Sequence, residues 1–457
     1  MNAEHPISRR NFLQLGASLG MLLGLSRFDW AAAATGSDYK ALVCLFMFGG
    51  NDGHNTVVPL QSTQYNAYVA ARGGLALPQN QLLPISDAAQ GAFGLHYGLP
   101  ELQALYAQGK MAILANVGML VQPTSYTQFS TAGYPLPLNL RSHADQVVQM
   151  QTGVPNAGGS TGWGGRTLDV LTSAYSYNSA TSFPVAISME GPALFCDGAI
   201  VQDISLEPGN YLGQNGMSLY PASAAQARAA AQAQMIAPSS GNTLIDAANK
   251  VMADALALHP LLQGAAAGVT FQKPFPSTDI GNQLQEIARF ISLHAQLNVG
   301  RQIFFCSLGG FDTHGGQSYQ QWDLLQQVSA ALDAFYSATV QLGVASQVTT
   351  FTLSDFGRTL QPSGTGSDHG WGNHHLIIGD AVQGGRIYGT FPLMTNYATF
   401  NATRDDYADN RGVMLPSVSL AQYGATLARW LGAGDADLDG VFPTLPSFSA
   451  RDLGFLT

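Results

Sequence analysis

The chain has 457 residues, of which 46% are hydrophobic and only 11% are charged, and its formal net charge is −10. This length and apolar content suffice for one large hydrophobic core. The acidic balance excludes a broad basic surface of the kind that binds nucleic acid. Three cysteines, an odd number, exclude a fully disulfide-paired framework. We expect Cys44 and Cys306 to be small buried side chains, because both lie in apolar runs.

The first 34 residues have the pattern of an export signal. Arg9 and Arg10 precede an apolar run over residues 15–25, and residues 31–34 are all alanine, which suits a signal peptidase. The paired arginines resemble the twin-arginine signal and predict a periplasmic or secreted protein. An uncleaved membrane anchor is the alternative, but the apolar run is shorter than the roughly 20 residues that span a bilayer. We expect no membrane span in the mature chain.

The mature chain, residues 38–457, alternates strand-like and helix-like segments. Helical spacing occurs at residues 100–108 and 322–342. This alternation predicts an α/β fold, a three-layer α/β/α sandwich with a mainly parallel central sheet. Residues 222–298 interrupt the alternation, and we predict a helical insertion there. Continuous apolar runs, as in strands buried on both faces, lie at residues 41–48, 111–117, 184–189, 302–308, 347–353 and 376–378.

Polar residues that follow the predicted strands form the candidate site, because ligands of open α/β sheets bind beyond the carboxyl ends of the strands. Asp52 follows the first predicted strand in a glycine-flanked turn. Asp312 and His314 follow the fourth, and Asp355 follows the fifth. Carboxylates and imidazoles from separate strand ends can hold a divalent ion. Asx-turns and surface side chains are the alternatives.

The loop before the last predicted strand is rich in histidine. His369, His374 and His375 are three of the chain's ten histidines and lie within seven residues. This density favours metal binding, with solvated loop histidines as the alternative. Arg358, three residues after Asp355, is a candidate for a salt bridge with that carboxylate or for clamping an anionic substrate.

A nucleophile is expected at the start of a helix. Ser142 and His143 open a predicted helix that ends at Thr152 and Gly153. The N-terminus of a helix favours anionic ligands. The alternative is that Ser142 only caps the helix.

These stretches together resemble the alkaline phosphatase superfamily, which includes sulfatases and phosphodiesterases. More narrowly, the chain resembles the family called domain of unknown function 1501, over nearly the whole mature chain. The wider resemblance implies divalent metal ions, with zinc as the first choice and manganese or calcium as alternatives. The stretches that carry the resemblance are Gly49–Asn55, Arg141–Gln146, Gly162–Arg166, Gly309–Gln317, Ser354–Arg358 and Asp368–His375.

The resemblance also implies roles for individual residues. Asp52, Asp312, His314 and Asp355 would bind metal, and His369, His374 or His375 would complete the ligands. In the superfamily the nucleophile lies nine residues before a Thr-Gly pair. That spacing favours His143, whereas the chemistry favours Ser142, ten residues before Thr152. Arg358 or Arg141 would hold the oxyanion.

The function implied by the resemblance is that of an exported, metal-dependent hydrolase of a phosphate or sulfate ester, acting on a small anionic substrate or a glycan. The alternative is a non-catalytic, metal-containing binding or assembly protein of the cell envelope. Phe356 stands where the superfamily has a histidine after the aspartate, and this departure favours the alternative. A redox enzyme is a third hypothesis, but no strand is followed by the Gly-x-Gly-x-x-Gly pattern of dinucleotide-binding proteins.

Overall fold

The computed structural model describes residues 38–156, 158–181, 183–209, 220–236, 268–398 and 405–457, with short pieces between residues 241 and 256. The chain divides into two units, residues 1–38 and residues 39–457. The export signal expected at residues 1–34 lies outside the described residues. In the described part of the chain, no helix has the length and apolarity needed to cross a membrane.

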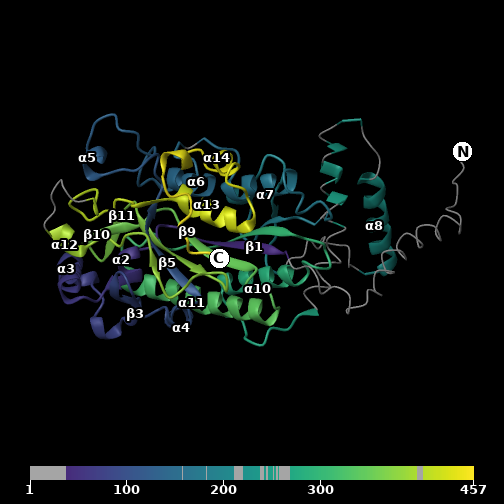
Figure 1. The fold of residues 1–457 in the computed structure, drawn as a ribbon. Coiled ribbons are helices and arrows are strands. Elements are labelled where there is room, and N and C mark those ends of the chain that lie inside the picture. The colour runs from purple at the N-terminus through teal and green to yellow at the C-terminus, as the bar shows by residue number, and fades with distance from the viewer. Residues whose placement is uncertain are drawn as a thin grey trace, which may run out of the picture. The chain divides into compact units, whose positions relative to one another are not determined.

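A nine-stranded, mostly parallel sheet forms the centre of the second unit within the described residues (Figure 1). The strand order is β13-β5-β12-β9-β1-β8-β6-β7, and β14 also pairs with β5. Only β12 runs antiparallel to its neighbours, β5 and β9. The strands are β1 (Lys40–Met47), β5 (Met111–Gly118), β6 (Ala186–Ser188), β7 (Ile204–Ser205), β8 (Arg301–Leu308), β9 (Val348–Ser354), β12 (Asn373–Ile378), β13 (Ile387–Tyr388) and β14 (Val418–Ser419).

Helices cover both faces of this sheet (Figure 1). One layer contains α4 (Pro100–Ala107), α10 (Asp279–Ser292) and α11 (Gln317–Gln341). The other contains α6 (His143–Thr152), α7 (Trp163–Ser173), α13 (Leu420–Leu431) and α14 (Leu438–Val441). Because both faces are covered, the central strands are apolar throughout: every residue of β5 and β8 is buried. The predicted three-layer α/β sandwich is confirmed.

Local sequence sets the ends of these helices. The Thr278 hydroxyl accepts the N–H of Gly281 at the start of α10, and Ser419 and Gln422 form a capping box at the start of α13. In α10 the apolar positions recur every three or four residues, so one stripe of the helix packs on β8. The α10 segment, which lies within the predicted insertion, therefore belongs to the helical layer. Residues 243–262 of the predicted insertion, which also have helical spacing, lie largely outside the described residues.

Smaller elements surround the sheet. A three-stranded antiparallel sheet consists of β2 (Val57–Pro59), β4 (Gly91–Leu95) and β3 (Leu83–Asp87). The stretch that reads as a loop before β12 contains a hairpin of β10 (Arg358–Ser363) and β11 (Gly366–His369). The remaining helices are α2 (Gly53–Thr56), α3 (Ser62–Arg72), α5 (Tyr126–Phe129), α8 (Ala222–Ile236) and α12 (Met394–Ala398), with 3-10 turns at Gly73–Leu75, Gln79–Gln81, Leu194–Cys196 and Leu445–Ser447.

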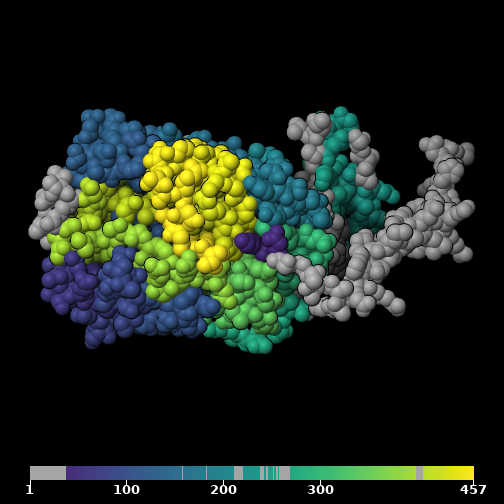
Figure 2. Space-filling model, in the orientation of Figure 1, coloured from purple at the N-terminus to yellow at the C-terminus, as the bar shows by residue number. Residues whose placement is uncertain are grey.

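The C-terminal segment closes the domain. In the view of Figure 2 it is drawn in yellow and lies against the blue and green parts of the chain. Phe455 is fully buried, and Leu456 forms a bridge with Val382. Cys44 and Cys306 are buried free thiols, as predicted.

Candidate metal centre

Three histidines and one aspartate meet beyond the carboxyl end of the sheet. His143 is the first residue of α6, Asp312 and His314 lie in the loop after β8, and His369 ends β11. Nε2 of His369 lies 3.0 Å from Nε2 of His143 and 2.9 Å from Nε2 of His314. Oδ1 of Asp312 lies 3.4, 3.1 and 3.3 Å from Nε2 of His143, His314 and His369, respectively. Five of the six separations among these four potential ligand atoms are therefore 2.9–3.4 Å, with His369 and Asp312 at the centre of the cluster.

These separations fit a bound cation. Four ligands placed tetrahedrally at about 2.0–2.1 Å from a zinc ion lie roughly 3.3 Å from one another. Within the described residues, His143, Asp312 and His369 form a group whose ligand atoms all lie within 4.8 Å of one another. Nε2 of His314 lies 2.9 Å from His369 and 3.1 Å from Asp312, but His314 is not part of that group.

The other ring nitrogen, Nδ1, of each histidine faces an oxygen acceptor. A nitrogen that faces a carboxylate or a carbonyl carries the ring hydrogen, so each Nε2 presents a lone pair. Three lone pairs aimed at one another repel unless a cation lies between them, and this is the arrangement expected of metal-binding histidines. The acceptors are Asp355 Oδ2 for His143 at 2.7 Å, the backbone oxygen of Arg141 for His369 at 2.8 Å, and Asp368 Oδ1 for His314 at 3.3 Å.

Burial favours the neutral form of the His369 ring. Loss of solvation is the main cause that lowers its pKa, and the charges of His143 and Arg358 lower it further, against a raising contribution from the backbone bond to Arg141. A neutral imidazole is the form that binds metal. The backbone of Arg141 has φ of 73°, in the left-handed region, where its carbonyl reaches His369.

Asp355 supports His143 and is not part of the four-atom cluster. Its Oδ1 accepts the backbone N–H of Gly49 at 3.1 Å, and its Oδ2 faces His143. Burial raises the pKa of Asp355, partly offset by the contacts with His143 and Gly49. The sequence predicts Asp355 as a metal ligand, whereas in the structure it contacts Nδ1 of His143, on the side of the ring away from the cluster.

Arg358 holds Asp312. Its side chain is 0% exposed, and its donors bind Asp312 Oδ1 and three backbone oxygens, those of Gly49 at 2.7 Å, Gly50 at 2.9 Å and Ser367 at 2.5 Å. Partial burial raises the pKa of Asp312, but the bond and charge of Arg358, aided by His314 and His143, bring it below its usual value. The salt bridge expected with Asp355 is thus made with Asp312, and the guanidinium is enclosed by protein.

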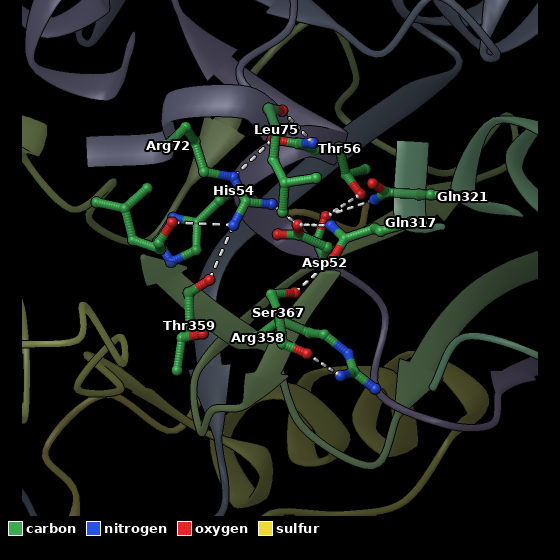
Figure 3. A network of polar contacts seen from close by, with 12 residues as sticks. Asp52, His54, Thr56, Arg72, Leu75, Gln317, Gln321, Arg358, Thr359 and Ser367 are labelled. Carbon is green, nitrogen blue, oxygen red and sulfur yellow. Dashed lines mark hydrogen bonds and ion pairs between the residues drawn. The ribbon is translucent and has the colours of Figure 1, made fainter. Parts of the chain in front are cut away.

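Asp52 lies in a different network, shown in Figure 3. Its carboxylate pairs with Arg72, and both side chains are 0% exposed. The side-chain amide of Gln317 also donates to this carboxylate. The structure therefore surrounds Asp52 with protein donors and does not bring it into the four-atom cluster.

His374 and His375 are buried in β12. Nδ1 of His374 accepts the backbone N–H of Asn116 at 3.1 Å, and its ring stacks on Phe391. His375 stacks on Tyr423, and burial lowers its pKa to about 3. Successive strand residues point to opposite faces, so these two histidines fill the packing layers on either side of the sheet.

The two nucleophile candidates are in different positions. Ser142 is the N-cap residue of α6, and its hydroxyl donates to Asp145 Oδ2 at 2.5 Å. His143, one residue on, points into the cluster. Asp368, which was not among the candidate residues, supports His314. Its position next to His369 in the sequence is the only signal that could have revealed it.

The cluster is open to solvent on one side. The side chains of Asp312 and His314 are 47% and 46% exposed. Two arginines lie near this side, each 39% exposed. Arg141 pairs with Asp409 at 2.6 Å, and Arg411 pairs with Asp368.

Fold and site together define an α/β protein with a candidate histidine–aspartate metal centre at the carboxyl edge of its sheet. The chain belongs to the family described as "Protein of unknown function (DUF1501)", whose model matches residues 39–405. No curated protein matches the sequence.

Some solved structures are distantly similar. Ps i-CgsB matches at 10% identity and a TM-score of 0.36, covering 91% of this chain and 77% of that chain. The same protein in complex with k-i-k-neocarrahexaose matches at 10% identity and a TM-score of 0.35, with the same coverage. The PsFucS1 sulfatase from Pseudoalteromonas sp. matches at 12% identity and a TM-score of 0.31, covering 88% of this chain and 77% of that chain. At these TM-scores the likeness carries no argument about chemistry.

Proposed function

We propose that this protein is an exported, metal-dependent hydrolase of phosphate or sulfate esters. One divalent ion would be held by Nε2 of His143, His314 and His369 and by Oδ1 of Asp312. The observation that carries the proposal is the set of five separations of 2.9–3.4 Å among these four atoms, with an acceptor behind each histidine. With the hydrogens on the Nδ1 atoms, the three Nε2 lone pairs and the carboxylate oxygen are free to bind a cation.

The donor set favours zinc. Imidazole nitrogens suit zinc, iron, copper and nickel, whereas calcium and magnesium prefer sites made only of oxygen. Three imidazoles and one carboxylate therefore favour zinc over calcium or manganese. One such cluster occurs in the part of the chain that the structure describes, which favours one ion for each chain.

A divalent ion at this position supplies Lewis-acid charge to an anionic ester. Other residues of the chain hold the proposed ligands in place. Asp355 fixes the ring of His143, and Arg358 fixes Asp312. Arg141 and Arg411 lie on the open side and offer guanidinium groups to a phosphate or sulfate, in exchange for Asp409 and Asp368.

Ser142 is the proposed nucleophile. It lies at the N-terminus of α6, where free N–H groups and the helix dipole favour negative charge, and it directly precedes the ligand His143. Its hydroxyl already donates to Asp145. The hydrogen bonds from Ser142 and Asn139 lower the pKa of Asp145, so this carboxylate orients the hydroxyl and is a weak base.

Metal analysis combined with turnover tests the proposal. We expect about one equivalent of zinc in the purified protein and hydrolysis of nitrophenyl phosphate, nitrophenyl sulfate or a sulfated oligosaccharide. His369→Ala should lose both metal and turnover, and Ser142→Ala should lose turnover and keep the metal. His294→Ala is the matched control, because this histidine lies away from the cluster. It stacks on Tyr39, just before the start of β1, whereas the cluster lies beyond the end of the sheet where β1 finishes. Wild-type protein without metal, or equal metal in His369→Ala, would contradict the proposal.

A second function, a non-catalytic binding or assembly protein of the cell envelope, is favoured by the number of ligands. Four protein ligands complete a tetrahedral zinc site, and closed sites of this kind are structural. In that case we expect one equivalent of zinc and no turnover of any ester, and a chelator should lower the melting temperature strongly.

A further inference from the structure

The four ligand atoms come from three segments that the sheet alone does not fix relative to one another. They are the start of α6, the glycine-rich loop of residues 309–316, and the hairpin of β10 and β11. A centre with ligand separations near 3 Å needs these segments to be fastened together. Gln317 stands where the loop meets the hairpin.

Gln317 makes an unusual set of contacts for a buried glutamine. It is 0% exposed, although it is the first residue of a helix. Its side-chain oxygen accepts the hydroxyl of Ser367 at 2.6 Å, and its side-chain amide donates to Asp52 Oδ2. Its backbone N–H donates to the backbone oxygen of Thr365 at 3.1 Å. Both ends of the side chain are therefore occupied.

The hydrogen bond between Gln317 and Ser367 forms a bridge, and both residues lie close in sequence to proposed ligands. Gln317 follows His314 by three residues, and Ser367 precedes His369 by two. The backbone oxygen of Ser367 accepts a hydrogen bond from Arg358, the residue that holds Asp312. The Ser367 backbone N–H donates to Thr313, between the two loop ligands, at 3.2 Å.

On its other side, the amide of Gln317 is bonded to Asp52, which forms a buried ion pair with Arg72 (Figure 3). Arg72 pairs with Asp52 and also donates to Asn55 and to the backbone oxygens of Thr359 and Leu360. A buried ion pair with this many additional bonds has one arrangement, since breaking any part leaves a charge unpaired. The pair is therefore a rigid support for the amide of Gln317.

We propose that Gln317 is a positioning residue of the metal centre, which fastens the loop of Asp312 and His314 to the strand of His369 and anchors both on the Asp52–Arg72 pair. The inference rests on the proposed function, because it needs the four-atom cluster to bind a cation. Partners that orient metal ligands typically change metal affinity by about 10–100-fold when removed. Asp52 acts here through Gln317 and not as a ligand.

The chain offers a matched control in Gln321. This residue lies one turn further along α11, is 1% exposed, and donates to the backbone oxygen of Asp52 at 2.9 Å. Gln317→Met and Gln321→Met each replace a buried amide with an apolar chain of similar length, and each removes a bond to Asp52. Only Gln317→Met breaks the bridge to Ser367.

The experiment measures zinc affinity by competition with a chromogenic chelator, and melting temperature in the metal-free state. We expect Gln317→Met to lower zinc affinity at least tenfold and Gln321→Met to leave it within about threefold, with similar losses of thermal stability. Ser367→Ala, which breaks the same bridge from the other side, should match Gln317→Met and serves if that variant fails to fold.

The outcomes separate the two proposals. If wild-type protein binds no zinc, the metal centre itself is refuted and the role of Gln317 with it. If wild type binds zinc and Gln317→Met or Ser367→Ala binds it equally well, only the positioning role is refuted. Equal losses of affinity in Gln317→Met and Gln321→Met would also refute it, because a general loss of packing would then explain both.

Discussion

The carboxylate of Asp355 lies 2.7 Å from Nδ1 of His143, and this contact determines which ring nitrogen of that histidine faces the cluster. The contact joins the end of β9 to the start of α6, 212 residues apart in the chain. Asp355 is buried and takes a second bond from Gly49, so its orientation does not depend on His143 alone.

Asp355→Asn should therefore weaken zinc binding by about 10–100-fold with little change in fold. The amide keeps the size of the carboxylate but loses its charge and can turn a donor toward Nδ1. Isothermal titration with zinc checks this, and Asp380→Asn is the control, since Asp380 is a paired carboxylate away from the cluster, bound to Lys110. Unchanged affinity in Asp355→Asn would show that His143 needs no such partner.

Arg72→Met should destabilise the protein by about 3–5 kcal/mol, because it leaves the carboxylate of Asp52 buried and unpaired. Urea unfolding measures this loss, and the double variant Arg72→Met with Asp52→Asn should recover part of it. Because the Asp52–Arg72 pair anchors Gln317, a given excess of zinc should stabilise Arg72→Met less than wild type. If zinc restored the single variant selectively, Asp52 would be shown to bind a cation when its arginine is absent.

Stability should fall as the pH drops below about 6.5. Burial lowers the pKa of His54 to about 4 and of His96 and His375 to about 3. Between these values and about 6.5, the unfolded chain takes up protons that the folded chain does not, so the contribution of these three histidines to the free energy of unfolding decreases with decreasing pH and levels off near pH 3.

Chemical unfolding at pH 7 and pH 5, with a chelator present, checks this expectation. One histidine with a pKa near 3 contributes roughly 2 kcal/mol to the loss at pH 5. His96→Gln should reduce the difference in the free energy of unfolding between pH 7 and pH 5 by about that amount, because glutamine does not take up a proton. The substitution loses little hydrogen bonding, since Nε2 of His96 has no partner and only Nδ1 accepts a bond, from Gly98. An unchanged difference would contradict a buried, neutral His96.

Export through the twin-arginine route is tested by replacing both arginines of the N-terminal pair. Arg9→Lys with Arg10→Lys should leave the full-length protein in the cytoplasm, whereas wild type should appear shortened in the periplasm or medium. Cell fractionation with immunoblotting measures both. Periplasmic protein from the double variant would point to another export route.

The sheet was predictable because its strands are buried on both faces and read as unbroken apolar runs. All six predicted strands correspond to strands of the central sheet, and the hairpin of β10 and β11 was missed because Arg358, Gln361 and Asp368 interrupt its apolar pattern. Polar side chains bury there because the hairpin packs on the ligand loop.

The site was predictable in its location and only partly in its members. Asp312, His314 and His369 were candidate ligands, and the structure brings them together with His143, which was a candidate nucleophile. Spacing along the chain could not distinguish Asp52 from a ligand, because its partner Arg72 lies 20 residues on, in a helix with no obvious link to the turn. Nor could the density of histidines in residues 369–375 show that a strand begins at Asn373 and turns two of them into the packing layers.

His143 and His369 are separated by 226 residues, yet their ring nitrogens lie 3.0 Å apart. No fragment that lacks either end of this span can present the complete set of donors. The complete set of donors therefore exists only once β8, β9 and the hairpin have taken their places. Metal content would then serve as a readout of correct maturation: a misfolded or truncated chain would be recognisable by its empty centre before any activity is measured.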